Sequence, residues 1–264
     1  MMNISKTATR VFKQLSVGLM LITFFASCKK DKLVATEKEP VTSTRSLDMV
    51  PYYKVQRVEN LQVETDDSNP TAPKPEVLFS LDYKKMQPAT YGKTSFWDIS
   101  FSGLYNSFMG GNNGSNSDNA GYTGPGAGGI TILAKSFEDL TDIPVASAFK
   151  TARALIGTDD MGEFGVGIGW YLYDFNGSIV GDGSYDKKHV AYALGNAFTL
   201  ANGQKTQPRT IIVRTAKGDF AKIKMISCYK DVFTTDKMMR NTPHMFFTFE
   251  YVIVPAGSTK FEIK

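Results

Sequence analysis

The sequence predicts a mostly β protein, an antiparallel β-rich domain with one or two short helices. Three observations support this fold class. Apolar and polar residues alternate over many short stretches, which is the period of a half-buried strand. Two such stretches flank a short Gly-containing turn and predict a β-hairpin. Only one stretch of the 264-residue chain places its apolar residues at helical spacing.

The chain begins with a pattern typical of an export signal. Residues 1–14 carry cations and no acid, and residues 15–26 form an apolar run too short to span a bilayer. The tetrapeptide FASC at 25–28 resembles the lipobox of bacterial lipoproteins. We therefore expect a signal peptide over residues 1–27 and a lipid on Cys28, the first residue of the mature protein.

Without this segment the protein is close to neutral. The formal charge of +4 includes Lys6, Arg10 and Lys13, which leave with the signal. A chain so near neutrality has no electrostatic basis for binding nucleic acid. The second cysteine, Cys228, lies in an alternating apolar stretch and is expected to be a buried free thiol. No intrachain disulfide is then possible, so the hydrophobic core alone must hold the fold.

The first half of the mature chain contains the expected tether and the first strands. Residues 28–51 are polar and mixed in charge, which predicts a flexible tether. The β domain is expected over residues 52–264. Its first strands are predicted at 53–63, where a bulge is expected, at 77–83 and at 96–101.

Residues 110–129 contain eight glycines and four asparagines, which predicts a long, mobile loop. The spacing of Gly124, Gly126 and Gly129 matches a dinucleotide-binding fingerprint. That chemistry requires a helix after the glycines, whereas a strand is predicted at 130–133. The match is therefore interpreted as coincidental. The asparagines and one carboxylate, Asp118, are too few anionic ligands for a calcium site.

The second half of the chain contains the predicted helix and the longest strands. A helix is expected over 144–155, with Pro144 in its first turn. The predicted strands are 166–174, the hairpin pair 209–215 and 219–229, the long aromatic strand 244–254, and an edge strand at 260–263. In the 219–229 strand the lysines alternate with apolar residues, which predicts one solvated face.

Signatures of an enzyme are missing from the sequence, so we expect a binding protein. No metalloprotease, zinc-site or nucleophile-elbow motif occurs. The two histidines, His189 and His244, are expected to pack or to lie at the surface. The acidic pairs at 66–67 and 159–160 are expected in solvated turns. Met161 differs, because it is an apolar residue in a polar turn, and a thioether can ligate haem iron.

Four stretches, taken in order, carry a family resemblance. They are SFWDISF at 95–101, the end of the Gly-rich loop at 126–129, the hairpin at 209–225, and FFTFEYVI at 246–253. Over residues 52–264 the chain resembles the HmuY family of haem-binding lipoproteins from Bacteroidetes. The resemblance implies a β-rich fold with a haem cleft at one end and a haemophore function in iron acquisition. It also implies an outer-membrane lipoprotein, expected at the cell surface, that passes haem to an outer-membrane receptor.

The resemblance also implies that two axial side chains, a histidine or a methionine pair, hold the haem iron. The first family ligand lies in an acidic turn after the Gly-rich loop, where this chain has Met161. The second lies before the 209 strand, at 192–198, where neither His nor Met occurs. Gly195 and Asn196 are nearest in position, and His189 lies just upstream. The candidate haem-binding residues are therefore Met161 and His189.

A second hypothesis belongs to another class. The chain is then a surface interaction lipoprotein, for a glycan, a protein or another ligand, that has kept the scaffold and lost haem ligation. The Gly/Asn loop at 110–129 would be its contact surface. The two hypotheses differ in whether Met161 and His189 converge on one apolar cleft.

Overall fold

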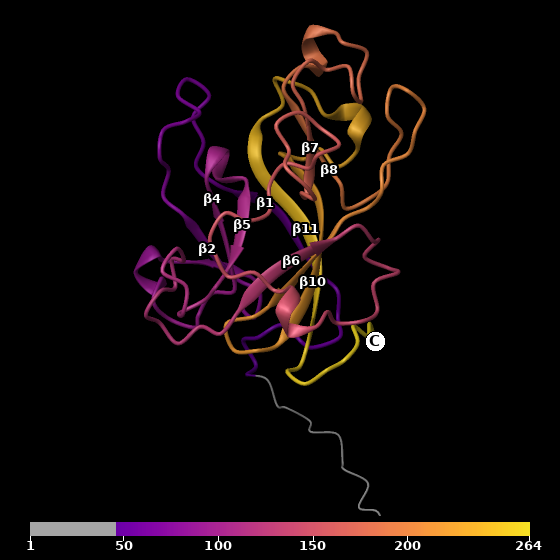
Figure 1. Ribbon diagram of the computed structural model, residues 1–264. Coiled ribbons are helices and arrows are strands. Elements are labelled where there is room, and N and C mark those ends of the chain that lie inside the picture. Colours follow the sequence, from indigo (N-terminus) through magenta and orange to yellow (C-terminus); the bar gives the residue numbers. More distant parts are fainter. Residues whose placement is uncertain (1–45) are drawn as a thin grey trace, which may run out of the picture. The chain divides into compact units, whose positions relative to one another are not determined.

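The protein is described by a computed structural model over residues 46–264 (Figure 1). The predicted signal at 1–27, Cys28 and most of the tether at 28–51 lie outside the described residues. The described part contains eleven strands and five short 3₁₀ helices, and every strand pairing is antiparallel. The predicted antiparallel β-rich fold class is therefore confirmed. None of the helices in the described residues is long and apolar enough to cross a membrane.

The larger sheet has five strands in the order β1-β11-β10-β9-β6. Two long strands lie at its centre because the 209–229 hairpin and the aromatic 244–254 strand pair with each other. The predicted hairpin and the predicted bulge in the first strand are both confirmed. The strands are β1 (Gln56–Gln62), β6 (Gly129–Leu133), β9 (Thr210–Arg214), β10 (Phe220–Tyr229) and β11 (His244–Val254).

The smaller sheets contain parts of three predicted strands and three short strands that the sequence did not predict. A four-stranded sheet has the order β3-β2-β4-β5, and β7 pairs with β8 alone. The strands β3, β5 and β8 are three or four residues long, too short to show a clear alternation. The bounds are β2 (Val77–Ser80), β3 (Lys85–Gln87), β4 (Ile99–Ser102), β5 (Phe108–Gly111), β7 (Tyr171–Asp174) and β8 (Val190–Ala193).

The helix predicted over 144–155 is wrong. Only the single turn η3 (Ala146–Ala148) forms there, and Val145 is 74% exposed. The backbone runs past the sheet edges instead: Lys150 bridges Ile130, and the N–H of Leu155 donates to Met109. The backbone groups of this segment thus bond to sheet edges instead of bonding to one another as they would in a helix. The other 3₁₀ turns are η1 (Ala89–Tyr91), η2 (Leu104–Asn106), η4 (Tyr185–Lys187) and η5 (Thr235–Lys237).

The core lies between the five-stranded and four-stranded sheets. Phe247 of β11 stacks on Phe101 of β4 with ring centroids 4.4 Å apart, and Phe249 meets the ring of Phe79 edge-on at 5.6 Å. Such aromatic pairs add about 0.5–1.5 kcal/mol beyond the burial of their area. The predicted apolar face of the 244–254 strand is confirmed, since its alternate residues from Met245 to Ile253 are all buried.

The other face of the five-stranded sheet is covered where the sequence predicted solvent. Lys222 is 2% exposed, and its Nζ donates to the carbonyls of Phe137 and Leu140, the latter at 2.9 Å. The rings of Phe137 and Phe261 lie against the same ammonium group. The prediction of a solvated lysine face is therefore wrong at Lys222. Segments distant in the chain form this cover, and strand periodicity does not reveal them.

Asp98 ties the two sheets together from inside. Its Oδ2 accepts a hydrogen bond from the N–H of Leu81 at 2.8 Å, and its Oδ1 accepts from the N–H of Ala216 at 3.2 Å. Burial, and the negative charge of Asp82, raise the pKa of Asp98 to about 6. The neighbouring Trp97 is also buried and donates from Nε1 to the carbonyl of Gly92. The Trp97-Asp98 pair is thus part of the structural framework.

The Gly/Asn segment at 110–129 is held by its own side chains. Asn119 Oδ1 accepts from the N–H of Asn113, and its Nδ2 donates to the carbonyls of Gly111 and Thr151, both at 2.7 Å. Asn113 Oδ1 caps the next turn by accepting two backbone N–H groups. The segment is irregular, as predicted, but this network does not fit the predicted mobile loop.

Two predictions at the chain ends need correction. The predicted tether ends before residue 51, because Val50 packs against the core and its N–H donates to the carbonyl of Asp82. Residues 260–263 do not form the predicted edge strand. They make a single bridge, between Lys260 and Asp142.

Candidate functional site

The sequence-predicted site residues lie on a small three-segment sheet. β7 pairs with β8 on one edge. On its other edge Thr158 forms a parallel bridge to Tyr171, and the N–H groups of Asp159 and Glu163 donate to the carbonyls of Tyr171 and Tyr173 at 2.8 and 2.9 Å. We call residues 158–164, 170–175 and 189–193, which include β7 and β8, the β7 unit. β7 and β8 are in the upper part of Figure 1.

Buried side chains anchor the β7 unit to the rest of the fold. The indole Nε1 of Trp170 donates to the carbonyl of Ser107 at 2.7 Å, and the hydroxyl of Tyr171 lies 2.9 Å from the Ser107 Oγ. On the β8 side, the N–H of Ala191 donates to the hydroxyl of Tyr229 in β10. These contacts hold one side of the unit against the sandwich and leave the other side to carry exposed groups.

Asp159 forms a buried ion pair that positions Met161. Arg209 donates from Nε to Asp159 Oδ2 at 2.7 Å, with the two side chains 6% and 0% exposed. Asp159 Oδ1 also accepts the N–H of Met161, and the Arg209 Nη2 lies 3.4 Å from the Met161 sulfur. The prediction of a solvated turn at Asp159 is therefore wrong. The charge lies inside because Arg209, fifty residues away in sequence, neutralises it.

His189 lies on the opposite edge of β7, just before β8. Its ring meets Phe175 edge-on with centroids 4.5 Å apart, and its Nδ1 is 3.0 Å from the hydroxyl of Tyr173. Burial, together with the positive charges of Arg240 and Lys188, lowers the pKa of His189. The ring is therefore neutral near pH 7. When Nδ1 carries the proton and donates it to Tyr173, Nε2 keeps a lone pair for a metal.

Large apolar side chains are exposed in the segment that follows Met161. Phe164 is 73% exposed and Val166 is fully exposed. The ring of Phe164 contacts both Tyr173 and Phe175, at 6.1 and 5.6 Å between centroids. We call Phe164, Tyr173, Phe175 and His189 the β7 aromatic cluster. Grouped exposed apolar side chains are typical of binding surfaces.

Met161 and His189 belong to the same unit but make different contacts. The two residues flank β7 from either edge, so their backbones are at least two strand spacings, roughly 10 Å, apart. The Met161 sulfur faces Arg209, whereas His189 faces Tyr173 and Phe175. Two hollows on the described surface are lined by other residues. The described residues contain no group of three or more His, Cys, Asp or Glu that could hold a metal ion.

The other positions considered from the sequence are packed against neighbouring residues. Gly195 lies so close to the carbonyl of Met225 that a Cβ would come within 2.1 Å of the oxygen. His244 starts β11 and lies between Tyr105 and Tyr229, in line with the packing role predicted for it. Cys228 is a buried free thiol, as predicted.

Sequence reasoning missed Tyr173, Phe175 and Arg209. The alternation of aromatic residues at 171, 173 and 175 was the signal for the first two. It indicated a strand without showing which face is exposed. Nothing in the sequence linked Arg209 to Asp159.

A scan against protein-family models and a search of curated proteins give no significant match to this chain. The resemblance to the HmuY family therefore stays a prediction.

Proposed function

We propose that the protein is a lipid-anchored envelope protein that binds haem or a related porphyrin at the β7 aromatic cluster. The observation that carries this proposal is an exposed aromatic surface beside a neutral histidine, with a methionine on the adjoining segment. A porphyrin presents two flat apolar faces and a central metal. Aromatic rings and soft or imidazole ligands suit both parts.

The described residues have distinct roles in this proposal. Phe164 and Phe175 cover apolar ligand surface, and His189 Nε2 meets the iron. Tyr173 fixes the tautomer of His189 by accepting from Nδ1. Met161 supplies the second axial ligand when its sulfur turns away from Arg209. The bound haem supplies the iron, and the protein captures it without performing chemistry, for transfer to an outer-membrane receptor.

Haemin titration of the purified protein tests the proposal. Under oxidising and reducing conditions we expect a shift of the Soret band that saturates at one equivalent. His189→Ala and Met161→Ala should each change the bound spectrum. The matched controls are His244→Ala and Met86→Ala, which alter the second histidine and a methionine exposed on β3. No Soret shift in either redox state would reject haem binding.

Two observations favour a second candidate, an interaction lipoprotein that kept the scaffold and lost haem ligation. Met161 and His189 face different partners rather than one shared cleft. Arg209 already engages the Met161 sulfur at 3.4 Å. If that contact persists, Met161 is a structural residue and the aromatic cluster binds a different apolar partner. A Met161→Ala spectrum identical to that of the parent protein would favour this candidate.

A further inference from the structure

Two cations lie beside the β7 aromatic cluster. Burial lowers the pKa of His189, and the positive charges of Arg240 and Lys188 add to this effect. Burial raises the pKa of Tyr173, and the charge of Arg240 opposes that shift. Water and salt screen charges, so such effects are appreciable only between groups that lie close together. Both cations therefore lie at the rim of the cluster, although neither takes part in the proposed ligation of iron.

A short helical turn positions both cations. The turn η4 precedes His189, and the N–H of Lys188 closes it by donating to the carbonyl of Tyr185 at 3.2 Å. Arg240 comes from a distant segment. Its N–H donates to the carbonyl of Asp186 at 2.7 Å, and its guanidinium lies 4.7 Å from the centre of the Tyr185 ring. Arg240 and Lys188 thus lie against the same turn, which leads directly into the histidine.

Neither of these cations has an ion-pair partner within the part of the chain that the structure describes. The ion pairs found there join other residues. The carboxylate that acts electrostatically on both His189 and Tyr173 is Glu163. It already accepts the N–H of Phe175 and, at 2.8 Å, the side-chain amide of Asn176. Two positive charges against one negative charge leave the rim of the cluster positive.

This rim suits a flat ligand that carries carboxylates at its margin. Phe164 and Phe175 offer exposed apolar surface, and the cations lie beside the other two members of the cluster. A guanidinium binds a carboxylate through two parallel hydrogen bonds, whereas an ammonium acts as a point charge. Haem and its metal-free parent carry carboxylate side chains on one edge of the macrocycle. A neutral macrocycle would leave both cations without an anion.

We propose that Arg240 and Lys188 bind the carboxylates of the porphyrin, so that the site selects carboxylated macrocycles over neutral ones. The proposal rests on the proposed porphyrin binding at the β7 aromatic cluster, but it does not require ligation of iron. His189 meets the metal at the centre of the ring, while the two cations hold its margin. Metal-free protoporphyrin IX should therefore bind through the same cations.

Fluorescence titration with protoporphyrin IX and with its dimethyl ester tests the proposal. The acid should bind the parent protein about tenfold more tightly than the ester, the gain expected for two partly exposed ion pairs. In the double variant Arg240→Gln/Lys188→Gln, the acid and the ester should bind alike. Comparing the two ligands in each protein removes differences in solubility, as in a double-mutant cycle. Each single substitution should weaken binding of the acid about threefold to fivefold.

Haemin serves as a further ligand, because it distinguishes charge from ligation. Arg240→Gln and Lys188→Gln should weaken the binding of haemin and of protoporphyrin to the same extent and leave the position of the Soret band unchanged. His189→Ala should change the haemin spectrum and leave protoporphyrin binding intact. Raising sodium chloride from about 0.05 M to about 0.5 M should weaken binding of the acid by the parent but not by the double variant.

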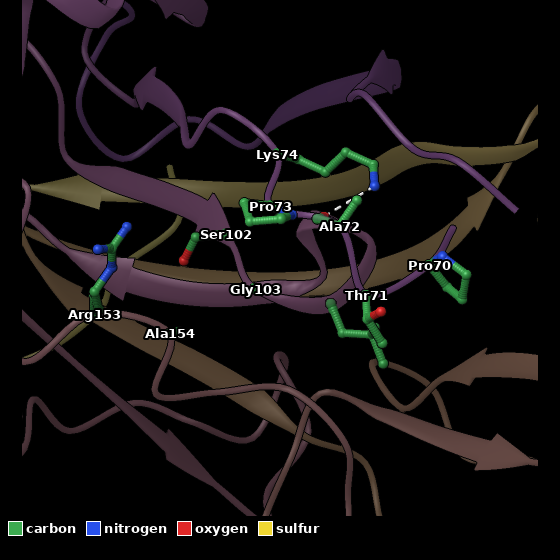
Figure 2. Close-up of a pocket in the computed structure, with 10 residues that line it drawn as sticks. Pro70, Thr71, Ala72, Pro73, Lys74, Ser102, Gly103, Arg153 and Ala154 are labelled. Atoms are coloured by element: carbon green, nitrogen blue, oxygen red, sulfur yellow. Dashed lines mark hydrogen bonds between the residues drawn. The ribbon is translucent and has the colours of Figure 1, made fainter. Parts of the chain in front are cut away.

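The matched controls are Arg153→Gln and Lys93→Gln. Arg153 lines a hollow of about 490 Å³ to which the β7 unit contributes no residue (Figure 2), and it pairs with Glu76 at 2.8 Å. Lys93 is exposed in the loop before β4. Neither change should alter the affinity for porphyrins. Cooperative melting of every variant shows that a loss of binding does not come from unfolding.

The outcomes separate this proposal from the proposed function. If porphyrins bind but the ratio of acid to ester affinity is the same in the parent and the double variant, the role of the cations is rejected and porphyrin binding stands. If no porphyrin binds, the proposed function is rejected and this proposal with it. If protoporphyrin binding depends on the cations while haemin gives no Soret shift, the role of the cations stands and iron ligation is rejected.

Discussion

The aromatic side chains of the sandwich core and those of the β7 aromatic cluster have opposite surroundings. Phe79, Phe101, Phe247 and Phe249 are at most 1% exposed, whereas Phe164 is 73% exposed and Phe175 is 39% exposed. Burial of a phenylalanine stabilises the fold by about 1.5–3 kcal/mol, which exposed rings do not contribute. The comparison shows that one region uses aromatic residues for stability, while the other leaves them at the surface.

The largest expected effect is a difference in stability between a variant of the sandwich core and a variant of the β7 aromatic cluster. Phe247→Ala removes a ring that stacks on Phe101 and meets Trp170, so we expect a loss of about 3–5 kcal/mol in the free energy of unfolding. Phe164→Ala should change that free energy by no more than about 0.5 kcal/mol but weaken haemin binding. Urea unfolding and haemin titration of both variants measure the difference. Equal losses of stability would remove the distinction between the regions.

The Asp159–Arg209 pair joins the β7 unit to the start of β9. Asp159→Asn leaves a buried guanidinium without its counter-ion at 2.7 Å, so we expect a loss of about 3 kcal/mol in urea unfolding. Its neighbour Asp160 is exposed, and Asp160→Asn is the matched control, with an expected change within about 0.5 kcal/mol. Similar behaviour of the two variants would show that the ion pair does not stabilise the unit.

The stability of the sandwich should also depend on pH. Burial raises the pKa of Asp98 to about 6 in the folded state, against about 3.9 in the unfolded chain. Protonation of Asp98 therefore favours the folded state. This contribution to the free energy of unfolding is complete below the unfolded pKa and is lost as the pH rises through about 6. Relative to Asp98→Asn, the parent should lose on the order of 2–3 kcal/mol between acid and neutral pH. A constant difference between their unfolding curves from acid to neutral pH would contradict the raised pKa.

Haemin binding at the β7 aromatic cluster should weaken in acid. Burial and the nearby cations lower the pKa of His189, so its imidazole is free to ligate at neutral pH. Haemin affinity should hold at neutral pH and decline only in acid, below the ordinary range of a histidine pKa, as the ring becomes protonated. His244→Ala is the control and should keep this profile. An unchanged affinity in acid would remove His189 from the site.

The strands that the sequence predicted best are the long ones. The 244–254 strand and the 209–229 hairpin have enough alternating residues to define both period and turn, and both form. Short strands such as β3 and β8 carry too few residues for a period to appear. The predicted helix at 144–155 failed because the edges of β5 and β6 capture its backbone hydrogen bonds.

The features of the candidate site were also only partly predictable from the sequence. Met161 and His189 were chosen from sequence, and the structure places them on either edge of β7. Nothing in the sequence indicated that Phe164 is exposed, or that one oxygen each of Ser102 and Glu76 is buried without a hydrogen bond. Those features depend on which segments cover a side chain, and the covering segments are distant in the chain.

Local patterns in the sequence were enough to predict the antiparallel β class, the main hairpin and the buried face of the aromatic strand. These depend on alternation between neighbouring residues, which is a local property of a chain in extended conformation. The burial of Asp159 and Lys222, the asparagine hydrogen bonds that hold the 110–129 segment, and the exposure of Phe164 and Phe175 became visible in the three-dimensional fold. Each of those outcomes requires partners brought from elsewhere in the chain, and the burial of a charge or the exposure of a ring is set by those partners.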